Sequence, residues 1–358
     1  MINWWNTDIG EVERSYLNKA FSEKRFSCGP YVREFEEHIE CEMNVAHAIV
    51  VPSGTAALTM SLLALDVGPG DEVIIPDMTW IATAQAASVL GAKVILVDAE
   101  SKEPVFDIEV LERNISEKTK VVIPVHFHGR SGDLDGLLAL QKNHNFSIVE
   151  DACKAMFCKS GNSFLGTRGD FGCFSLGMIS LLSVGYGGFV VTNDDILADK
   201  CRLIRDHGMQ RQPEHYLCNG FNFKVSDLLL AVGKGQLERI EEKKEHLINV
   251  YKLYEDGLKD SNFVDLLPVD HEKGTIPLCV DLKCVHREEL AEFLMKGDIE
   301  ISKFHKPVHT ANYLGTFNSK SFPNSIRFSE QGFMPPCGPS QSFDNIYKTI
   351  ELILKFSV

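Results

Sequence analysis

The feature that most constrains the fold is an alternation of short apolar, β-branched runs with segments of helical periodicity. Continuous apolar runs are typical of strands buried on both faces of a parallel sheet. The expected strands are Ala48–Val51, Glu72–Ile75, Lys93–Val97, Val121–Val125, Ser147–Glu150, Gly172–Ser175 and Gly188–Thr192. The helices expected among them include Thr55–Leu65, Ile81–Leu90 and Asp195–Asp206. The pattern predicts an α/β fold whose large domain has a mainly parallel seven-stranded sheet covered by helices.

The pattern changes after about Gly235, where the strand–helix alternation stops. The segments expected beyond it are a long amphipathic helix at Leu237–Leu258, a strand at Ile276–Leu282, and helices at Arg287–Lys296 and Asn345–Phe356. The charged run Glu238–Glu245 mixes both signs and is typical of a solvated helix face. We therefore expect a large domain over residues 1–236 and a smaller C-terminal α+β domain over residues 237–358.

Charge and hydropathy exclude several classes of partner. The chain has 36 Lys and Arg against 50 Asp and Glu, a net charge of −14, and should repel nucleic acid and anionic lipid. No apolar stretch approaches the roughly 20 residues that span a bilayer, and the N-terminus does not have the form of a signal peptide. The ten cysteines show no zinc-type spacing, so we expect no metal. A cytoplasmic protein without nucleic acid or membrane partners is predicted.

The stretch Pro52–Ala57 follows an expected strand and opens an expected helix. Gly54 allows the backbone to turn tightly, and the free amides of a first helical turn, aided by the helix dipole, can bind a phosphate. An ordinary Ser or Gly helix cap is the alternative.

Glu150 and Asp151 end another expected strand, where a buried carboxylate is costly unless it is paired. A protonated ring nitrogen of a bound cofactor would be a suitable partner. A carboxylate that caps a neighbouring helix is the alternative.

Three more stretches combine small, aromatic and polar residues. Gly169–Ser175 and the small-residue loop after it surround a backbone that a ligand can approach closely. Gly220–Lys224 places Asn222 and Lys224 on alternate positions beside two aromatic residues. His305–His309 has a histidine at each end, and a surface loop is the alternative for it.

Together, in this order and at these separations, the five stretches resemble the fold-type I pyridoxal-phosphate enzymes of the DegT/DnrJ/EryC1/StrS class. The likeness covers nearly the whole chain, from Cys28 to the final helix. It implies an aminotransferase that uses pyridoxal or pyridoxamine 5′-phosphate and acts on a keto sugar attached to a nucleotide. Glutamate as the amino donor, and a place in surface polysaccharide or glycoside biosynthesis, are implied by the same resemblance.

The resemblance also implies roles for the matched residues. Asp151 matches the carboxylate that keeps the cofactor's ring nitrogen protonated, and Trp80 matches the aromatic residue that stacks on the ring. Asn222 matches a residue delivered from the neighbouring subunit, which implies a homodimer with shared active sites. The residues expected to hold the phosphate are Gly54, Thr55, Ala56 and Ser175, and those expected near the substrate are Lys224, His305 and His309.

The chain departs from the family at its defining residue. The lysine that forms a Schiff base with the cofactor lies five residues beyond the serine that matches Ser175, and here that position is Ser180. No lysine occurs between Lys159 and Lys200. A serine hydroxyl cannot form a Schiff base and moves protons poorly without an adjacent base. Lys154 stands where the family usually has Gln or another polar residue, whose side chain contacts the ring hydroxyl of the cofactor.

Three interpretations of Ser180 follow. In the first, the cofactor site persists while turnover is lost or reduced, or an external aldimine is trapped. In the second, the chain works like the family's sugar 3-dehydratases, which also lack the lysine but use a histidine. In the third, Lys154 acts as the amine or proton carrier instead of only contacting the ring. A non-catalytic binding homologue is a further alternative, whereas a dinucleotide-binding dehydrogenase is disfavoured because Pro52–Leu58 has one glycine.

Overall fold

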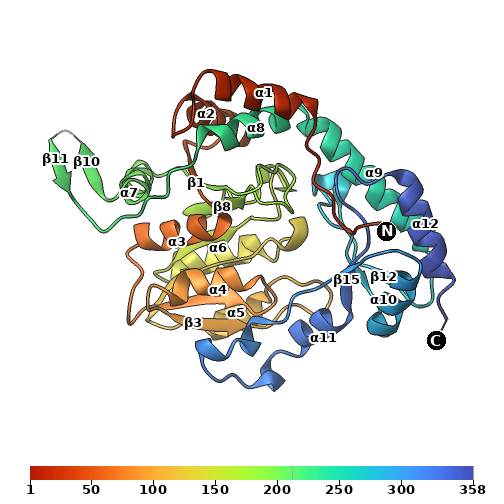
Figure 1. The fold of residues 1–358 in the computed structure, drawn as a ribbon. Coiled ribbons are helices and arrows are strands. Elements are labelled where there is room, and N and C mark those ends of the chain that lie inside the picture. Colours follow the sequence, from red (N-terminus) through yellow and green to blue (C-terminus); the bar gives the residue numbers. More distant parts are fainter. Residues whose placement is uncertain (212, 358) are drawn as a thin grey trace.

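The computed structural model describes residues 1–211 and 213–357, and its centre is a seven-stranded sheet (Figure 1). Its strands are β1 (His47–Val51), β2 (Glu72–Pro76), β3 (Lys93–Val97), β4 (Thr119–Val122), β5 (Ser147–Asp151), β8 (Phe171–Ser175) and β9 (Gly188–Thr192). Their order is β1-β9-β8-β5-β4-β2-β3. β9 is antiparallel to both neighbours, and the other pairs are parallel. The predicted fold class is therefore confirmed.

Helices cover both faces of the sheet, as its apolar strands require. In β2, Val73 and Ile75 belong to the core under α3 and α4, while Ile74 belongs to the core under α5 and α6. This two-sided burial explains why the strands lack polar alternation. The helices of this part are α1 (Glu11–Ser22), α2 (Pro30–Met43), α3 (Gly54–Ala64), α4 (Ile81–Ser88), α5 (Ile108–Arg113), α6 (Leu134–Asn143), α7 (Asp195–Arg205) and α8 (Asp227–Glu238).

The C-terminal part holds a small antiparallel sheet with strand order β12-β13-β15-β14. Figure 1 shows α9, α10 and α12 around it. The elements are α9 (Ile240–Leu258), β12 (Asp265–Leu266), β13 (Leu282–Lys283), α10 (Arg287–Lys296), β14 (Ser302–Lys303), α11 (Pro323–Gln331), β15 (Gly332–Met334) and α12 (Phe343–Leu354). None of the helices in the described parts of the chain is both long and apolar enough to cross a bilayer.

Two small hairpins and five short 3₁₀ turns complete the described chain. The hairpins pair β6 (Lys159–Ser160) with β7 (Ser163–Phe164) and β10 (Met209–Arg211) with β11 (Glu214–Tyr216). The turns are η1 (Phe127–Gly129), η2 (His271–Lys273), η3 (Val308–Thr310), η4 (Asn312–Leu314) and η5 (Ser319–Ser321). The β10–β11 hairpin projects from the body of the molecule beside α7 (Figure 1).

The expected single helix at Leu237–Leu258 is wrong at its start. α8 ends at Glu238 and α9 begins at Ile240, and Arg239 between them has φ −108° and ψ 13°. The Arg239 amide bonds the carbonyl three residues back, as at a helix end, while its guanidinium reaches Asp8 at 2.8 Å. This contact with the N-terminal segment favours a break that the periodicity does not reveal.

The expected strand at Ile276–Leu282 is also wrong, because only Leu282 lies in a strand, β13. Pro277 has no amide hydrogen to donate to a ladder. The Ile276 amide donates instead to Cys158 Sγ at 3.3 Å. The apolar run is buried because it packs between the two parts of the molecule, not because it pairs in a sheet.

The domain division after residue 236 stays a prediction, but two segments cross it. Near the N-terminus, Ile2 forms a parallel bridge with Ile299, so this end of the chain lies beside the C-terminal part (Figure 1). In the other direction, Val308 and Phe322 pack into the core of the seven-stranded sheet. The two parts are therefore tied together at both ends of the chain.

Candidate functional site

Three of the predicted stretches converge at one edge of the seven-stranded sheet. A Cβ atom on Gly54 would lie 2.6 Å from Cys153 Sγ and 3.2 Å from Ser175 Cβ. Gly54 opens α3 after β1, Cys153 follows β5, and Ser175 ends β8. The close approach explains why glycine stands at position 54, and the carboxyl ends of parallel strands are where ligands bind in such sheets.

The N-terminus of α3 presents two free amides to this edge. Ser53 Oγ accepts a hydrogen bond from the Ala56 amide at 3.0 Å and caps the helix. The amides of Gly54 and Thr55 have no acceptor among the described residues. Unpaired amides and the positive end of a helix dipole suit a phosphate. Ala56 remains a predicted ligand, although its amide already has a partner.

Asp151 is a buried carboxylate without a cation. It is 6% exposed, and its oxygens accept hydrogen bonds from Thr83 Oγ1 at 2.8 Å and from the Cys153 amide at 3.2 Å. No Lys, Arg or His among the described residues forms an ion pair with it, although a buried charge normally needs one. The site therefore fits a ligand that brings its own positive charge to Asp151.

The neighbouring Glu150 has a structural role. It is fully buried, and its carboxylate accepts hydrogen bonds from His126 Nε2 at 2.7 Å and from the amides of Gly166, Arg168 and Gly169 at 2.7–2.8 Å. Burial alone would raise the pKa of Glu150, but the His126 interaction and the amide donors lower it below its usual value. Glu150 thus orders the loop before β8, a structural role that differs from the helix cap of the alternative, because the amides it binds belong to no helix.

Trp80 and His305 form an aromatic pair from distant parts of the chain. Trp80 caps α4 and is 59% exposed. Its ring centroid lies 4.8 Å from that of His305, with the ring planes at 65°. Burial, together with the charges of His128 and Lys154, lowers the pKa of His305 to about 4. His305 is therefore a neutral imidazole at neutral pH, close to the predicted ring-stacking residue.

Ser180 and Lys154 line one small cavity of about 10 Å³. Ser180 is 3% exposed, and its Oγ has no hydrogen-bond partner among the described residues. Lys154 Nζ donates to the carbonyl oxygen of Ile179. Burial lowers the pKa of Lys154. The structure thus brings together the two positions at which the chain departs from the family pattern.

Asn222 and Lys224 lie elsewhere, beside α7 and the β10–β11 hairpin. Asn222 forms an isolated bridge with Asp206, and Lys224 forms an ion pair with the same aspartate. Lys224 also lines a cavity of about 700 Å³ together with Arg202 and Arg205, among others. No described contact joins Asn222 or Lys224 to Asp151, so the predicted roles of these two residues at the site stay predictions.

His309 is held by the sheet edge. Its Nδ1 bonds Asp77 Oδ2 at 2.7 Å, its amide bonds Asp77 Oδ1 at 2.7 Å, and its ring stacks on Phe322 at 4.8 Å. Asp77 directly follows β2. The predicted contact of His309 with substrate stays a prediction, and the observed contacts anchor the loop that carries His305.

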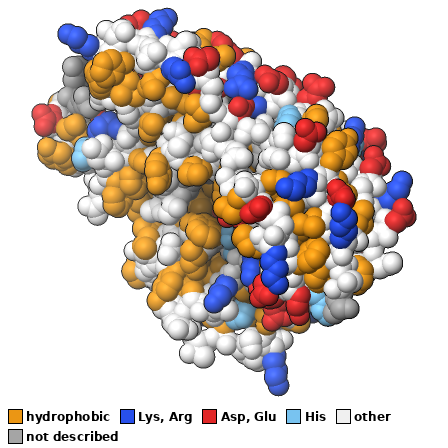
Figure 2. Space-filling model, turned by 45° about the vertical axis from the view of Figure 1, so that its right-hand side comes forward, with side chains coloured by type: hydrophobic (Ala, Val, Ile, Leu, Met, Phe, Trp, Pro, Cys, Tyr) orange, Lys and Arg blue, Asp and Glu red, His pale blue; other side chains and the backbone are white. Residues whose placement is uncertain are grey.

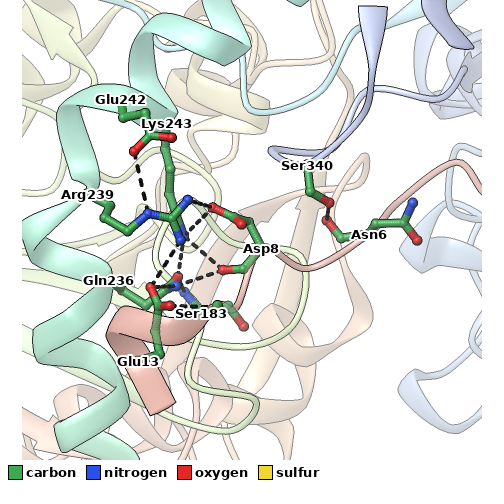
Figure 3. Close-up of polar contacts among 10 residues, drawn as sticks. Asn6, Asp8, Glu13, Ser183, Gln236, Arg239, Glu242, Lys243 and Ser340 are labelled. Carbon is green, nitrogen blue, oxygen red and sulfur yellow. Dashed lines mark hydrogen bonds and ion pairs between the residues drawn. The ribbon is translucent and has the colours of Figure 1, made fainter. Parts of the chain in front are cut away.

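A buried polar network around Gln236 and Lys243, which reaches the backbone of Ser183, was not predicted (Figure 3). Gln236 Oε1 accepts hydrogen bonds from the Ser183 amide at 3.2 Å and from Lys243 Nζ at 2.6 Å. Lys243 is 2% exposed and also contacts Asp8, so the expectation that Glu238–Glu245 is a solvated face is wrong for this residue. Its buried contacts are with an N-terminal segment that local periodicity cannot detect. The network anchors the loop that carries Ser180.

A second unpredicted cluster joins the two parts of the molecule. Asp281 accepts hydrogen bonds from His128 Nδ1 at 2.8 Å and from the guanidinium of Arg130. Arg130 also donates to the backbone carbonyls of Leu267 and Pro268. All three charged side chains are buried. Asp281 lies about 150 residues after His128 and Arg130, so the only local signal in the sequence is an Asp within an apolar run.

The chain is similar over nearly its whole length to proteins of one family. The sequence profile of the DegT/DnrJ/EryC1/StrS aminotransferase family matches residues 7–353. GDP-perosamine synthase of Escherichia coli O157:H7 is 30% identical, with 96% of this chain and 95% of that protein covered. The UDP-4-amino-4-deoxy-L-arabinose–oxoglutarate aminotransferase of Shewanella sediminis is also 30% identical, with the same coverage of 96% and 95%.

Solved structures agree with these relatives. The aminotransferase TlmJ from Streptoalloteichus hindustanus superposes with a TM-score of 0.94 at 23% identity, covering 99% of this chain and 98% of its own. A DegT DnrJ EryC1 StrS aminotransferase from Brucella abortus gives a TM-score of 0.90 at 25% identity, with 96% and 94% covered. At such identities the likeness to TlmJ concerns the fold, which is that of this aminotransferase class.

Proposed function

Because the chain belongs to the DegT/DnrJ/EryC1/StrS family of pyridoxal-phosphate-dependent aminotransferases, we propose that it transfers an amino group to a keto sugar attached to a nucleotide. The names of its relatives contain GDP- and UDP-linked sugars. Another relative, 30% identical, is a spore coat polysaccharide biosynthesis protein of Bacillus subtilis. Glutamate is the proposed amino donor, and cytoplasmic synthesis of a surface polysaccharide or glycoside is the proposed setting.

The observation that carries the proposal is the buried Asp151 carboxylate, which forms no ion pair among the described residues and lies at the same sheet edge as the free amides of α3. A cation that also carries a phosphate would satisfy both features. Pyridoxal and pyridoxamine 5′-phosphate are such molecules, since each joins a protonatable ring nitrogen to a phosphate. The residues present therefore fit the family's cofactor.

Each residue at this edge has a distinct proposed task. Asp151 would hold a proton on the ring nitrogen, and Trp80 would cover one face of the ring. Gly54, Thr55 and Ser175 would bind the phosphate. When bound, the cofactor's ring accepts the electron pair left on carbon after a C–H bond breaks. Thr83 fixes the Asp151 carboxylate by its 2.8 Å hydrogen bond, so the acceptor is oriented before the cofactor arrives.

Ser180 should slow this chemistry. The Ser180 hydroxyl has no hydrogen-bond partner among the described residues, so no hydrogen-bonded base makes it a proton carrier. We therefore propose a turnover below that of lysine-bearing relatives, in a site that still binds cofactor and substrate.

A homodimer with shared sites is part of the proposal. Patches of hydrophobic side chains remain on the surface of the single chain (Figure 2). Exposed apolar residues on the loops near the site include Trp80, Met178 and Tyr186. The projecting β10–β11 hairpin and the nearby Asn222 make no described contact with Asp151 of the same chain. In an isologous two-fold dimer, each chain would cover the apolar loops of the other and would place its own Asn222 at the other chain's site.

The test of the proposed function is a single-turnover reaction. The protein, loaded with pyridoxamine phosphate, is mixed with a panel of GDP- and UDP-linked keto sugars. We expect one of them to gain an amino group while the cofactor becomes the aldehyde form, which mass spectrometry and absorbance record. If neither this chain nor its Ser180→Lys variant binds the cofactor or produces an amino sugar across the panel, the proposal is wrong.

Gly54→Ala should weaken cofactor binding about tenfold or more, equivalent to roughly 1.4 kcal/mol. The added methyl would meet Cys153 Sγ at 2.6 Å and displace the start of α3 from its phosphate-binding position. Equilibrium dialysis with pyridoxamine phosphate measures the change. Gly68→Ala is the matched control, because its methyl would meet no atom within 4 Å, and its dissociation constant should not change.

A second function, loss of a sugar hydroxyl as in the family's 3-dehydratases, is favoured by one observation. Those enzymes lack the lysine and use a histidine, and the neutral His305 lies 4.8 Å from Trp80. The same incubation distinguishes the two functions, because a dehydratase product lacks the 3-hydroxyl and carries no new amino group.

A further inference from the structure

Lys154 and Ser180 reach the same place from two adjacent strands. Lys154 follows the end of β5 at Asp151, and Ser180 follows the end of β8 at Ser175. β5 and β8 are parallel neighbours, so both segments leave the sheet at the same edge. Both side chains line the cavity of about 10 Å³ described above. A lysine thus stands beside the position at which the family's lysine is missing.

The amine of Lys154 is available for chemistry. Its described hydrogen bond goes to the carbonyl oxygen of Ile179, the residue before Ser180. No carboxylate among the described residues forms an ion pair with Lys154. Burial lowers the pKa of Lys154, which increases the neutral fraction of its amine near neutral pH. The neutral amine is the nucleophilic form.

A second buried lysine, Lys243, differs from Lys154 in the partners of its amine. Burial also lowers the pKa of Lys243, but its Nζ lies 2.6 Å from Gln236 Oε1 and 3.5 Å from the Asp8 carboxylate (Figure 3). Those contacts hold Lys243 in a structural network. Lys154 forms no ion pair with a carboxylate in the described part of the chain, and it stands three residues beyond Asp151.

We propose that Lys154 replaces the family's missing lysine and forms the covalent bond to the aldehyde carbon of pyridoxal 5′-phosphate. This inference rests on the proposed function, since it needs the cofactor in the site. The small side chain of Ser180 contributes by leaving the cavity to the Lys154 amine.

The bond-forming step is balanced without any further reactant. The neutral Nζ atom bonds to the aldehyde carbon as the carbon–oxygen double bond breaks. Both amine protons end on the aldehyde oxygen, which leaves as one water molecule, and a carbon–nitrogen double bond remains. An incoming substrate amine displaces Nζ by the same exchange, which returns Lys154 as a free amine.

The test separates covalent attachment from binding. Pyridoxamine phosphate has no aldehyde, so its binding by dialysis reports on the site alone. Pyridoxal phosphate is then added at one equivalent, reduced with borohydride, and the labelled peptide is identified by mass spectrometry. We expect the label on Lys154, and we expect Lys154→Gln and Lys154→Arg to lose it. Both variants should still bind pyridoxamine phosphate.

Lys159→Gln is the matched control, because Lys159 is an exposed lysine on the nearby β6 strand, and this variant should keep the label on Lys154. Binding of pyridoxamine phosphate with label scattered over surface lysines, or with label that persists in Lys154→Gln, would overturn the inference and leave the proposed function standing. If neither cofactor binds, both the proposed function and this inference fail.

Discussion

Ser180→Lys is expected to raise the rate of amino transfer about 10²- to 10⁴-fold, the range that a positioned proton carrier contributes. The new amine would stand where relatives have their lysine, at a position that is 3% exposed and whose present hydroxyl bonds to none of the described residues. Single-turnover rates with pyridoxamine phosphate and the substrate found in the panel measure the gain. Ser180→Met, similar in length but without an amine, should give no gain.

The size of the cavity lined by Lys154 and Ser180 leads to a further prediction for a double variant. At about 10 Å³ it leaves little free space for a second lysine headgroup, so the Ser180→Lys and Lys154 side chains would crowd each other, and two amines in one buried site lower each other's pKa. The double variant Ser180→Lys/Lys154→Gln restores the family's usual residues at both positions and should be faster than Ser180→Lys alone. An equal rate in Ser180→Met and Ser180→Lys would show that position 180 does not limit turnover.

The fold was predictable from the sequence where continuous apolar runs indicate strands buried on both faces of a sheet. All seven expected strands lie in one sheet, because runs such as Ala48–Val51 have no polar face to turn outward. The same pattern misled at Ile276–Leu282, where burial comes from packing between the two parts of the molecule. Apolar content reports that a segment is buried but does not report what buries it.

The site was predictable in part for a related reason. Strand ends at a common edge bring Gly54, Asp151 and Ser175 together, and the family resemblance then supplied their roles. Contacts such as Asp77 with His309, 232 residues apart, have no local signature. The same holds for the amine of Lys154 beside Ile179, since nothing in either stretch alone indicates the other.

Asp281→Asn is expected to lower the free energy of unfolding by about 3–5 kcal/mol, the cost of removing one partner from a buried charge cluster. The change leaves the guanidinium of Arg130 and the ring of His128 without a carboxylate, in a place where all three side chains are buried. Urea unfolding measures the loss. Asp265→Asn is the matched control in the small sheet, because its side chain is 80% exposed, its contact with Lys283 is 3.9 Å long, and it should cost under about 1 kcal/mol.

The pH dependence of unfolding tests whether the charge cluster of Asp281, His128 and Arg130 accounts for the effect of Asp281→Asn. Burial alone would raise the pKa of Asp281, but the charges of His128 and Arg130 lower it below its usual value. The contribution of Asp281 to the free energy of unfolding is therefore present above about pH 4 and is lost as the pH falls through the folded pKa. Burial alone would lower the pKa of His128, but Asp281 raises it above its usual value. The contribution of His128 to the free energy of unfolding is therefore present below about pH 6.5 and is lost as the pH rises through the pKa of the folded state. The difference in unfolding free energy between the wild-type chain and Asp281→Asn should therefore be largest between these two limits. A difference that stays constant with pH would show that lost packing, and not the charge cluster, accounts for the destabilisation.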